Sequence, residues 1–375
     1  MRWQAWCDRT GFVSFPAVAA DVAAYLQEAS RVERPGGVGP YAASTLSRWV
    51  AGIDAVHRAA SDERPELVVP GQTVLVRRTL SAIRRRRAAD RSTPARKQAC
   101  PLSRSDLVAM MHRMDMCHWP AGVAARRDAA VLLVGWVGAR RSGEIANIRV
   151  HDVTWCVDHV QVRIPVSKTD QGGQGHTVVL PRADLEPALC APCALHRWIT
   201  LRCAIWAAGH PPPGVDETLL APSTVARHRG ARETTAAMSV VLAWQPTTNT
   251  PVHVCGTPPG TGPIRSEAIP LESRLPGHGA DRLFTAVHRT GRLSDRMSSE
   301  VVTDIVTRAR RAADLPTEGY SSHSLRAGFV TTADKGGADI MAIQQQTAHR
   351  THESVAVYRR RNNPSDGNAV HALGL

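Results

Sequence analysis

Four residues near the end of this chain could together do chemistry on a phosphate ester: His323, Arg326, His349 and Tyr358. His323 and Arg326 stand three residues apart, so a helix would present both side chains on one face. His349 follows Arg326 by 23 residues, and Tyr358 follows His349 by nine. Guanidinium and imidazole groups can hold phosphate oxygens, and a phenol oxygen can act as a nucleophile. This order predicts a site that binds a phosphodiester and attacks it with a tyrosine oxygen.

The other three tyrosines are weaker candidates for that nucleophile. Tyr25 and Tyr41 belong to the N-terminal part of the chain. Tyr320 stands three residues before His323 and is the one serious rival, but it would lie in the loop that enters the same helix. We therefore assign the nucleophile to Tyr358.

Helices are predicted ahead of these residues. Ser103 can cap a helix whose first turn contains Asp106, and residues 129–137 form a nearly continuous apolar stretch that predicts a buried helix. Another helix leads into His323. Its apolar positions recur with the helical period at Val302, Ile305, Val306 and Ala309.

The apolar period changes to two after Asp152, which predicts strands. Residues 177–180 form a second apolar run beyond a polar, glycine-rich turn at 168–175, so we expect a hairpin or small sheet. Pro165 favours an edge strand, because proline cannot donate a hydrogen bond to a neighbour. The first strand alternates at Val160, Val162, Ile164 and Val166.

Residues 1–98 are predicted to form a separate helical domain, followed by a second domain over 99–375. Residues 77–104 contain ten arginines or lysines and one acid, Asp90. Pro94 and Pro101 bracket this run, so we interpret it as a linker whose charge tracks phosphates at an interdomain hinge. One helix of the first domain shows the helical period at Leu46, Trp49, Val50 and Ile53.

The segment 210–280 interrupts the second domain. It contains 11 of the 25 prolines and few periodic apolar positions. We expect a proline- and glycine-rich insertion there, in the form of a long loop or a disordered segment.

The composition favours a polyanionic partner. The 375 residues carry a formal net charge of +13, and nucleic acid is the first candidate for a globular protein this basic. No apolar stretch approaches the ~20 residues that span a bilayer, and the first residues do not form a signal peptide. We therefore expect a cytoplasmic protein without a membrane partner.

The eight cysteines indicate free thiols in a reducing compartment. Cys190, Cys193 and His196 form the one suggestive group. A lone pair of this spacing can bind zinc, but no second ligand pair stands at a zinc-finger spacing, so we favour small buried cysteines at a helix start and predict no metal.

Four sequence elements resemble, in order, the motifs of the tyrosine recombinases of the phage integrase family. The resemblance covers nearly all of the chain outside 210–280. It implies a mainly α fold with a small antiparallel β-sheet: a helical core-binding domain, then an α+β catalytic domain. The four elements are Arg141-Ser-Gly-Glu144-Ile followed by Asp152, the run 166–172 with Lys168, His323-x-x-Arg326, and His349 with Tyr358.

Two positions depart from the family pattern. The first arginine of the family usually stands in G-x-R-x-S-E. Counting back from Glu144 selects Arg141, whereas counting forward from Gly138 selects Arg140, and we favour Arg141. The residue before His349 is Ala348, where glycine is more usual.

The resemblance implies a role for each matching residue. Arg141 and Arg326 would neutralise the nonbridging oxygens, Lys168 would protonate the leaving 5′ oxygen, and His323 would assist the tyrosine proton or bind the phosphate. His349 would bind a nonbridging oxygen. Tyr358 would form a covalent phosphotyrosine, a reaction that needs no ATP, cofactor or metal.

These roles imply a site-specific DNA recombinase of integrase or mobile-element type. The family implies a tetramer on paired half-sites of double-stranded DNA, and an accessory factor could set the direction of recombination. Two alternatives stay open: a type IB topoisomerase-like enzyme that acts as a monomer, and a catalytically inactive DNA-binding relative.

Overall fold

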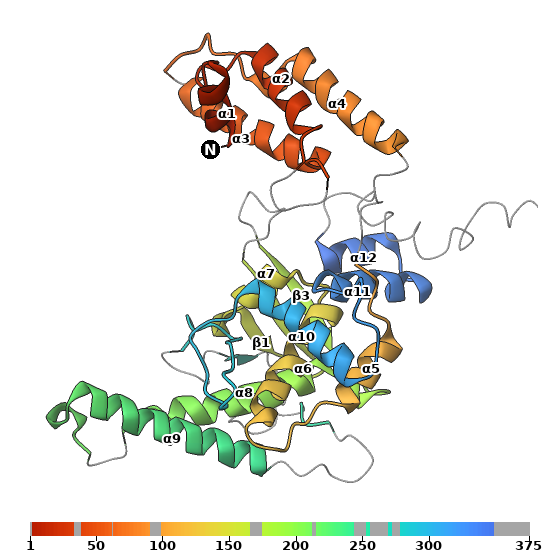
Figure 1. Ribbon diagram of the computed structural model, residues 1–375. Coiled ribbons are helices and arrows are strands. Elements are labelled where there is room, and N and C mark those ends of the chain that lie inside the picture. Colours follow the sequence, from red (N-terminus) through yellow and green to blue (C-terminus); the bar gives the residue numbers. More distant parts are fainter. Residues whose placement is uncertain are drawn as a thin grey trace, which may run out of the picture. The chain divides into compact units, whose positions relative to one another are not determined.

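A computed structural model describes residues 2–33, 39–61, 63–90, 99–165, 175–211, 215–243, 253–255, 269–271 and 278–348. It divides into two compact units, Met1–Lys97 and Gln98–Leu375 (Figure 1). The described part is mainly helical with one small antiparallel sheet, as the sequence predicted. None of the described helices is both long and apolar enough to cross a bilayer.

Unit 1 is a helical unit with a core of its own. Trp3 and Trp6 stack on each other, and both pack against the buried ring of Tyr25. Burial raises the pKa of Tyr25 to about 12. The helices are α1 (Arg2–Thr10), α2 (Ala19–Ala29), α3 (Ala43–Ser61), the 3₁₀ turn η1 (Pro70–Gln72) and α4 (Val74–Ala89).

Helix α4 corrects the expectation of a basic linker. Thr73 caps it, and Val76, Thr79, Leu80 and Ile83 are buried against the unit. The arginines up to position 87 therefore belong to an amphipathic helix, with Arg77, Arg78, Arg84, Arg85 and Arg86 exposed. Pro94 lies outside the described residues. The helical period of the buried positions was not recognised in the sequence, because the four successive arginines at 84–87 dominate the composition of this stretch.

Unit 2 combines helices with one sheet, whose strands β2 and β3 bury alternate side chains. Its helices before the sheet are α5 (Arg104–His112), α6 (Ala121–Val137), α7 (Ser142–Asn147) and η2 (Val150–Asp152). Ser103 caps α5 and exchanges hydrogen bonds with Asp106, as the sequence predicted. The later helices are η3 (Pro187–Leu189), α8 (Ala191–Ala208), η4 (Glu217–Leu219), α9 (Pro222–Leu242), α10 (Ser299–Ala312), α11 (His323–Lys335) and α12 (Ile340–Thr347).

The sheet has the strand order β3-β2-β1-β4 and is antiparallel throughout. Its strands are β1 (Val153–Trp155), β2 (His159–Ile164), β3 (His176–Pro181) and β4 (Ile269–Pro270). Val160 pairs with Leu180 and Val162 with Val178, so all four side chains enter the core on one face. The edge-strand prediction is wrong, because β2 is flanked by β1 and β3 and Pro165 stands just beyond its end.

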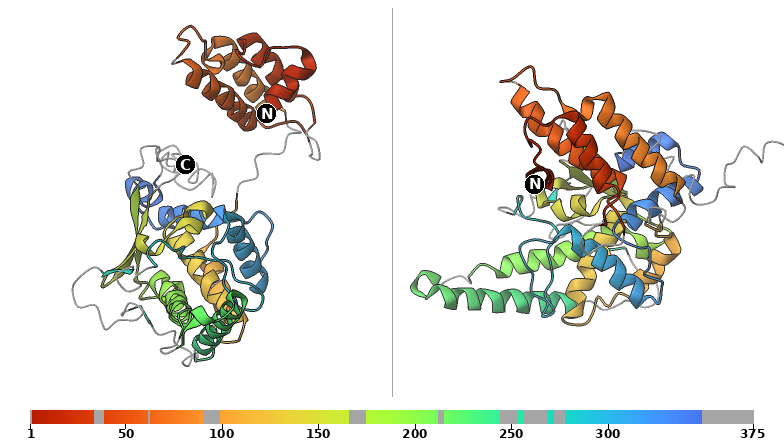
Figure 2. Two further views of the ribbon diagram at one scale, coloured as in Figure 1. Left: turned by 90° about the vertical axis from the view of Figure 1, so that its left-hand side faces the viewer. Right: turned by 45° about the horizontal axis from the view of Figure 1, so that its top comes forward.

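The expected loop at 210–280 also needs correction. Pro222 opens the 21-residue helix α9, which lies along α8 at one side of unit 2 (Figures 1 and 2). Only Ala237 and Val241 of α9 are buried, so the helix shows little apolar periodicity. Cys255, Ile269 and Leu271 likewise belong to ordered parts of this segment.

Candidate active site

The turn between α6 and α7 places two arginines side by side in different surroundings. The turn uses a left-handed residue, Ala139, at φ 53°. Arg141 then caps α7, and its side chain is 25% exposed. Its Nη1 donates to the Glu144 carboxylate at 2.8 Å, and its backbone N–H donates to the same group at 3.1 Å.

Arg140, in contrast, is fully buried. Its Nε donates to the Gly138 carbonyl at 2.5 Å, and its two terminal nitrogens contact His176 Nε2 and the Gln346 carbonyl. Glu144 lies 3.4 Å from Nη1. Burial lowers the pKa of Arg140 to about 10, and the nearby Glu144 charge opposes that shift. Arg140 thus links α6, β3 and α12 through the protein interior.

The carboxylate of Glu144 forms ion pairs with both Arg140 and Arg141. Burial by itself would raise its pKa, but the Arg140 charge and the hydrogen bonds from Arg141 hold that pKa below its ordinary value. Asp152 has a separate task, because it accepts the backbone N–H of Arg149 at 2.8 Å where η2 leads into β1. Glu144 therefore orients the first arginine pair, and Asp152 orients the entry to the sheet.

Helix α11 brings Arg326 to the same turn. Arg326 is buried, and its Nη1 donates to the Ala139 carbonyl at 2.8 Å. His323 is the first residue of α11 and is exposed. Gly328 and Gly135 allow this close packing, because a Cβ on Gly328 would lie 2.1 Å from the Leu102 carbonyl and one on Gly135 would lie 2.7 Å from Leu325.

Helix α12 ends against the arginine turn as well. The Gln346 side chain donates to the carbonyls of Val137 at 3.1 Å and Val179 at 2.9 Å, and the backbone carbonyl of Gln346 accepts from Arg140. Ala348 then adopts a left-handed conformation, with φ 52°. That conformation explains why glycine is favoured at this position, since an L side chain is strained there.

The structure thus brings Arg326 and the end of α12 to the turn that precedes Arg141, with His323 on the same helix as Arg326. Lys168, His349 and Tyr358 lie outside the described residues. Lys168 belongs to the connection between β2 and β3, whose strands are described. The ring of Tyr320, the rival nucleophile, packs against the Arg310 guanidinium, whose carbon lies 3.4 Å from the ring centre.

A second cluster of side chains, which could bind a metal ion, was not predicted from the sequence. Cys190, Cys193, His253 and Cys255 place their ligand atoms within 4.8 Å of one another. His196 is not a member and instead meets the ring of Trp155 edge-on. The second ligand pair has the unusual spacing His-x-Cys and lies 60 residues away in the segment expected to be a loop, so spacing alone could not find it.

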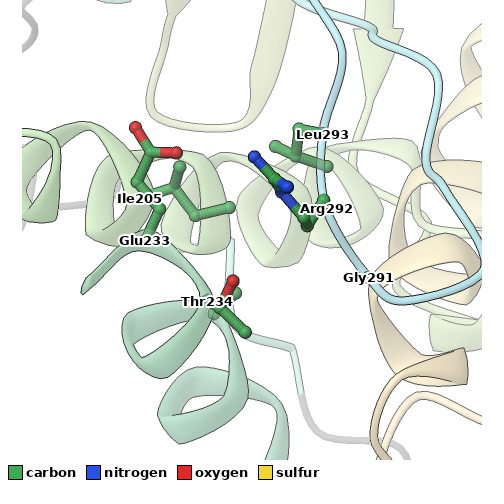
Figure 3. Close-up of a pocket in the computed structure, with 7 residues that line it drawn as sticks. Ile205, Glu233, Thr234, Gly291, Arg292 and Leu293 are labelled. Carbon is green, nitrogen blue, oxygen red and sulfur yellow. The ribbon is translucent and has the colours of Figure 1, made fainter. Parts of the chain in front are cut away.

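A small hollow beside α9 is unrelated to either cluster. Ile205, Glu233, Thr234 and residues 291–293 line it, and the Arg292 side chain points into it toward Ile205 (Figure 3). The hollow lies between α8, α9 and the loop before α10, and none of the residues predicted to bind phosphate lines it.

Comparison with known proteins adds to this geometry. The sequence model of the phage integrase family matches residues 271–364. An integrase/recombinase xerD homolog of Selenomonas ruminantium is 23% identical over 368 residues, which cover 98% of this chain and 81% of that protein.

Several solved structures are also similar. XerH site-specific recombinase on its palindromic difH substrate has a TM-score of 0.48 at 13% identity, over 95% of this chain and 72% of that one. A lambda integrase (75–356) dimer on a COC′ core site has a TM-score of 0.43 at 14% identity, over 96% and 89%. The Tn1549 transposon integrase with transposon right end DNA has a TM-score of 0.43 at 12% identity, over 96% and 86%.

Proposed function

This chain belongs to the phage integrase family of tyrosine recombinases, and from that premise we propose that it is a site-specific DNA recombinase that works through a 3′-phosphotyrosine. The family match includes His323, Arg326, His349 and Tyr358. Arg141 and Lys168 complete the proposed set from the preceding part of unit 2.

One observation carries the proposal: three segments distant in sequence meet at the arginine turn. Arg326 of α11 contacts Ala139, and Gln346 of α12 contacts Arg140. His349 follows Gln346 by three residues, and the chain advances at most about 3.6 Å per residue. The anchored end of α12 therefore supports placing His349, and Tyr358 nine residues later, in reach of the two arginines.

The chemistry follows from the residue types. Tyr358 passes its phenol proton to His323 and attacks phosphorus, a P–O bond to tyrosine forms, and the bond to the 5′ oxygen breaks. Arg141 and Arg326 stabilise the charge on the nonbridging oxygens, and Lys168 gives its proton to the leaving 5′ oxygen. The 5′ hydroxyl of another strand reverses the step. Bond energy is conserved in the phosphotyrosine, so the proposal requires no ATP, and the two arginines fill the charge-stabilising role that a metal ion has in many nucleases.

Arg141, in preference to Arg140, is proposed as the first phosphate ligand. Arg140 directs its guanidinium into the interior, where carbonyls and His176 accept its hydrogen bonds. Arg141 is partly exposed, and Glu144 holds it from one side. In this arrangement the guanidinium of Arg141 is held in position and is accessible to an incoming phosphate.

Unit 1 is proposed to bind the DNA backbone through α4. Arg31, Arg78 and Arg86 line an open hollow between α2 and α4, and Gln27 completes its polar wall. A row of guanidiniums on one helix suits a phosphate backbone. Recombination further implies four copies of the chain on two pairs of half-sites, with an accessory factor setting direction.

A duplex nicked inside the spacer tests the proposal. Its substrate is built from inverted repeats of about 10–13 base pairs sought near the gene, since paired half-sites mirror paired protomers. Cleavage releases a short strand that cannot rejoin, so the expected result is a covalent protein–DNA band for the wild type and for Tyr320→Phe. Tyr358→Phe should bind the duplex without forming the band.

The alternatives predict other outcomes. Binding by the wild type without a covalent band would support an inactive DNA-binding relative. Relaxation of supercoiled DNA by monomers on single sites would support the topoisomerase-like enzyme and contradict the recombinase.

A further inference from the structure

The four donors Cys190, Cys193, His253 and Cys255 have the separations of a tetrahedral metal site. Zinc–sulfur bonds of about 2.3 Å and a zinc–nitrogen bond of about 2.05 Å at tetrahedral angles give S···S edges of about 3.8 Å and S···N edges of about 3.6 Å. Cys190 Sγ and Cys255 Sγ lie 3.8 Å apart. His253 Nδ1 lies 3.3 Å from Cys193 Sγ and 3.8 Å from Cys255 Sγ.

The start of α8 favours thiolates at Cys190 and Cys193. Cys190 immediately precedes α8 and Cys193 lies in its first turn, where the helix dipole stabilises negative charge. The Val254 backbone N–H donates to Cys193 Sγ at 3.3 Å.

The surrounding groups also complement a metal centre. The Asp184 carboxylate lies 3.9 Å from His253 Nε2, on the opposite side of the ring from Nδ1. This distance is too long for a hydrogen bond, but the nearby negative charge favours a proton on Nε2, which leaves Nδ1 as the ligand atom. Three thiolates and Zn²⁺ carry a net charge of −1, and the half-buried Arg197 of α8 interacts electrostatically with all three cysteines.

We propose that Cys190, Cys193, His253 and Cys255 form a structural zinc site. Three sulfur ligands and one imidazole are a donor set that zinc prefers, and a closed four-ligand shell is typical of a structural ion. Three of the residues are buried and His253 is nearly so, which leaves no open coordination position for a substrate.

The site would fasten the segment after α9 to the start of α8. Within the described residues, 253–255 is a short stretch whose Cys255 carbonyl also accepts from Trp155 Nε1 of β1 at 3.2 Å. Zinc would therefore tie together α8, the sheet and a segment with little secondary structure of its own. None of its ligands belongs to the set proposed to act on DNA, so the inference does not depend on the proposed function.

Metal content of the full-length chain tests the site. The chain is purified from zinc-supplemented medium, passed through a desalting column and analysed by elemental mass spectrometry. We expect about one zinc ion per wild-type chain and about tenfold less for Cys190→Ser and Cys255→Ser. Cys203→Ala is the matched control, because Cys203 lies on the same helix outside the cluster, and it should retain zinc.

Two further measurements cover variants that fail to fold. Cys255→His preserves a four-ligand set and should keep the ion. Wild-type chain stripped of metal and titrated with Co²⁺ should give the absorption of a tetrahedral thiolate complex. Zinc-free wild type that neither takes up Zn²⁺ nor gives this spectrum, or that has lost two thiols to a Cys190–Cys255 disulfide, would overturn the proposal.

Discussion

At the scale of residues, the decisive contrast is between two neighbouring arginines. Arg140 is buried and bonded to interior acceptors, whereas Arg141 is partly exposed and held by Glu144. The sequence pattern alone allowed both positions, because Gly138 and Glu144 give different counts. Side-chain burial separates them, and burial depends on packing against α12 and β3 that no local motif reveals.

Replacing Arg141 and Arg140 separately should affect different properties: the rate of DNA cleavage for Arg141 and the stability of the fold for Arg140. Arg141→Ala should lower the rate of covalent complex formation by about 10²–10³-fold with little change in stability, since one charge-stabilising group is lost. Arg140→Ala should lower the free energy of unfolding by about 3 kcal/mol, because Glu144 and two carbonyls lose a buried partner. Cleavage kinetics and urea unfolding check both variants. Equal loss of stability in both would contradict the assignment.

The Glu144 carboxylate should make stability depend on pH. Its pKa is lowered in the folded protein, so its contribution is present above the unfolded value of about 4.3 and is lost as pH falls through the folded value. Glu144→Gln should therefore cost about 1–3 kcal/mol at pH 7 and progressively less below pH 4. Chemical unfolding at several pH values measures this. A deficit that stays constant down to pH 2 would show that the charge is not responsible.

At the scale of elements, the site depends on how closely α11 approaches α6. Trp136 Nε1 donates to the Leu102 carbonyl at 2.9 Å, and Gly328 packs against both of these groups. Because Arg326 is two residues before Gly328, any displacement of α11 moves its guanidinium away from Ala139.

Gly328→Ala should therefore be strongly destabilising. The added Cβ would lie 2.1 Å from a backbone oxygen that cannot move freely, and the expected cost is about 2–3 kcal/mol. Gly143→Ala is the control for stability, because a Cβ there meets nothing within 4 Å and should be neutral or stabilising by up to about 1 kcal/mol. Thermal unfolding compares the two. A Gly328→Ala variant as stable as the control would mean that the helices are less tightly packed.

The elements also show what could be predicted from the sequence. Helices α3 and α10 and the β2–β3 pair follow directly from apolar periods of 3.6 and two, and the buried part of α6 follows from its nearly continuous apolar run. Helix α9 could not be predicted, because it buries only Ala237 and Val241 and the prolines around it dominate the composition. The place of β2 between two strands depends on β1, which is only three residues long and therefore too short to show an apolar period.

At the scale of the whole molecule, the chain consists of two units with separate cores and a strong positive charge. Each unit has its own cluster of buried apolar residues. The net charge of +13 is consistent with a DNA-binding surface on each of the two units. The positive charge of residues 77–87 is compatible with a linker or with a helix. The buried apolar face of α4 shows that these residues form a helix.

The exposed arginines of α4 should set the salt dependence of DNA binding. Replacing Arg78 and Arg85 by alanine should reduce the slope of log affinity against log salt by about two, since each phosphate contact contributes about 0.9. Arg9→Ala is the control, because Arg9 is paired with Glu28 at 2.9 Å on another helix. Binding titrations from low to high salt measure the slope. An unchanged slope in the double variant would exclude α4 from the interface.

The most direct test of the account is to locate the covalent bond. The complex trapped on a nicked duplex is digested with nuclease and trypsin, and the peptides are sequenced by mass spectrometry. The account predicts a nucleotide on the phenol oxygen of Tyr358, in the tryptic peptide that covers residues 351–359. A nucleotide on Tyr320, on a serine, or on any other residue would contradict it.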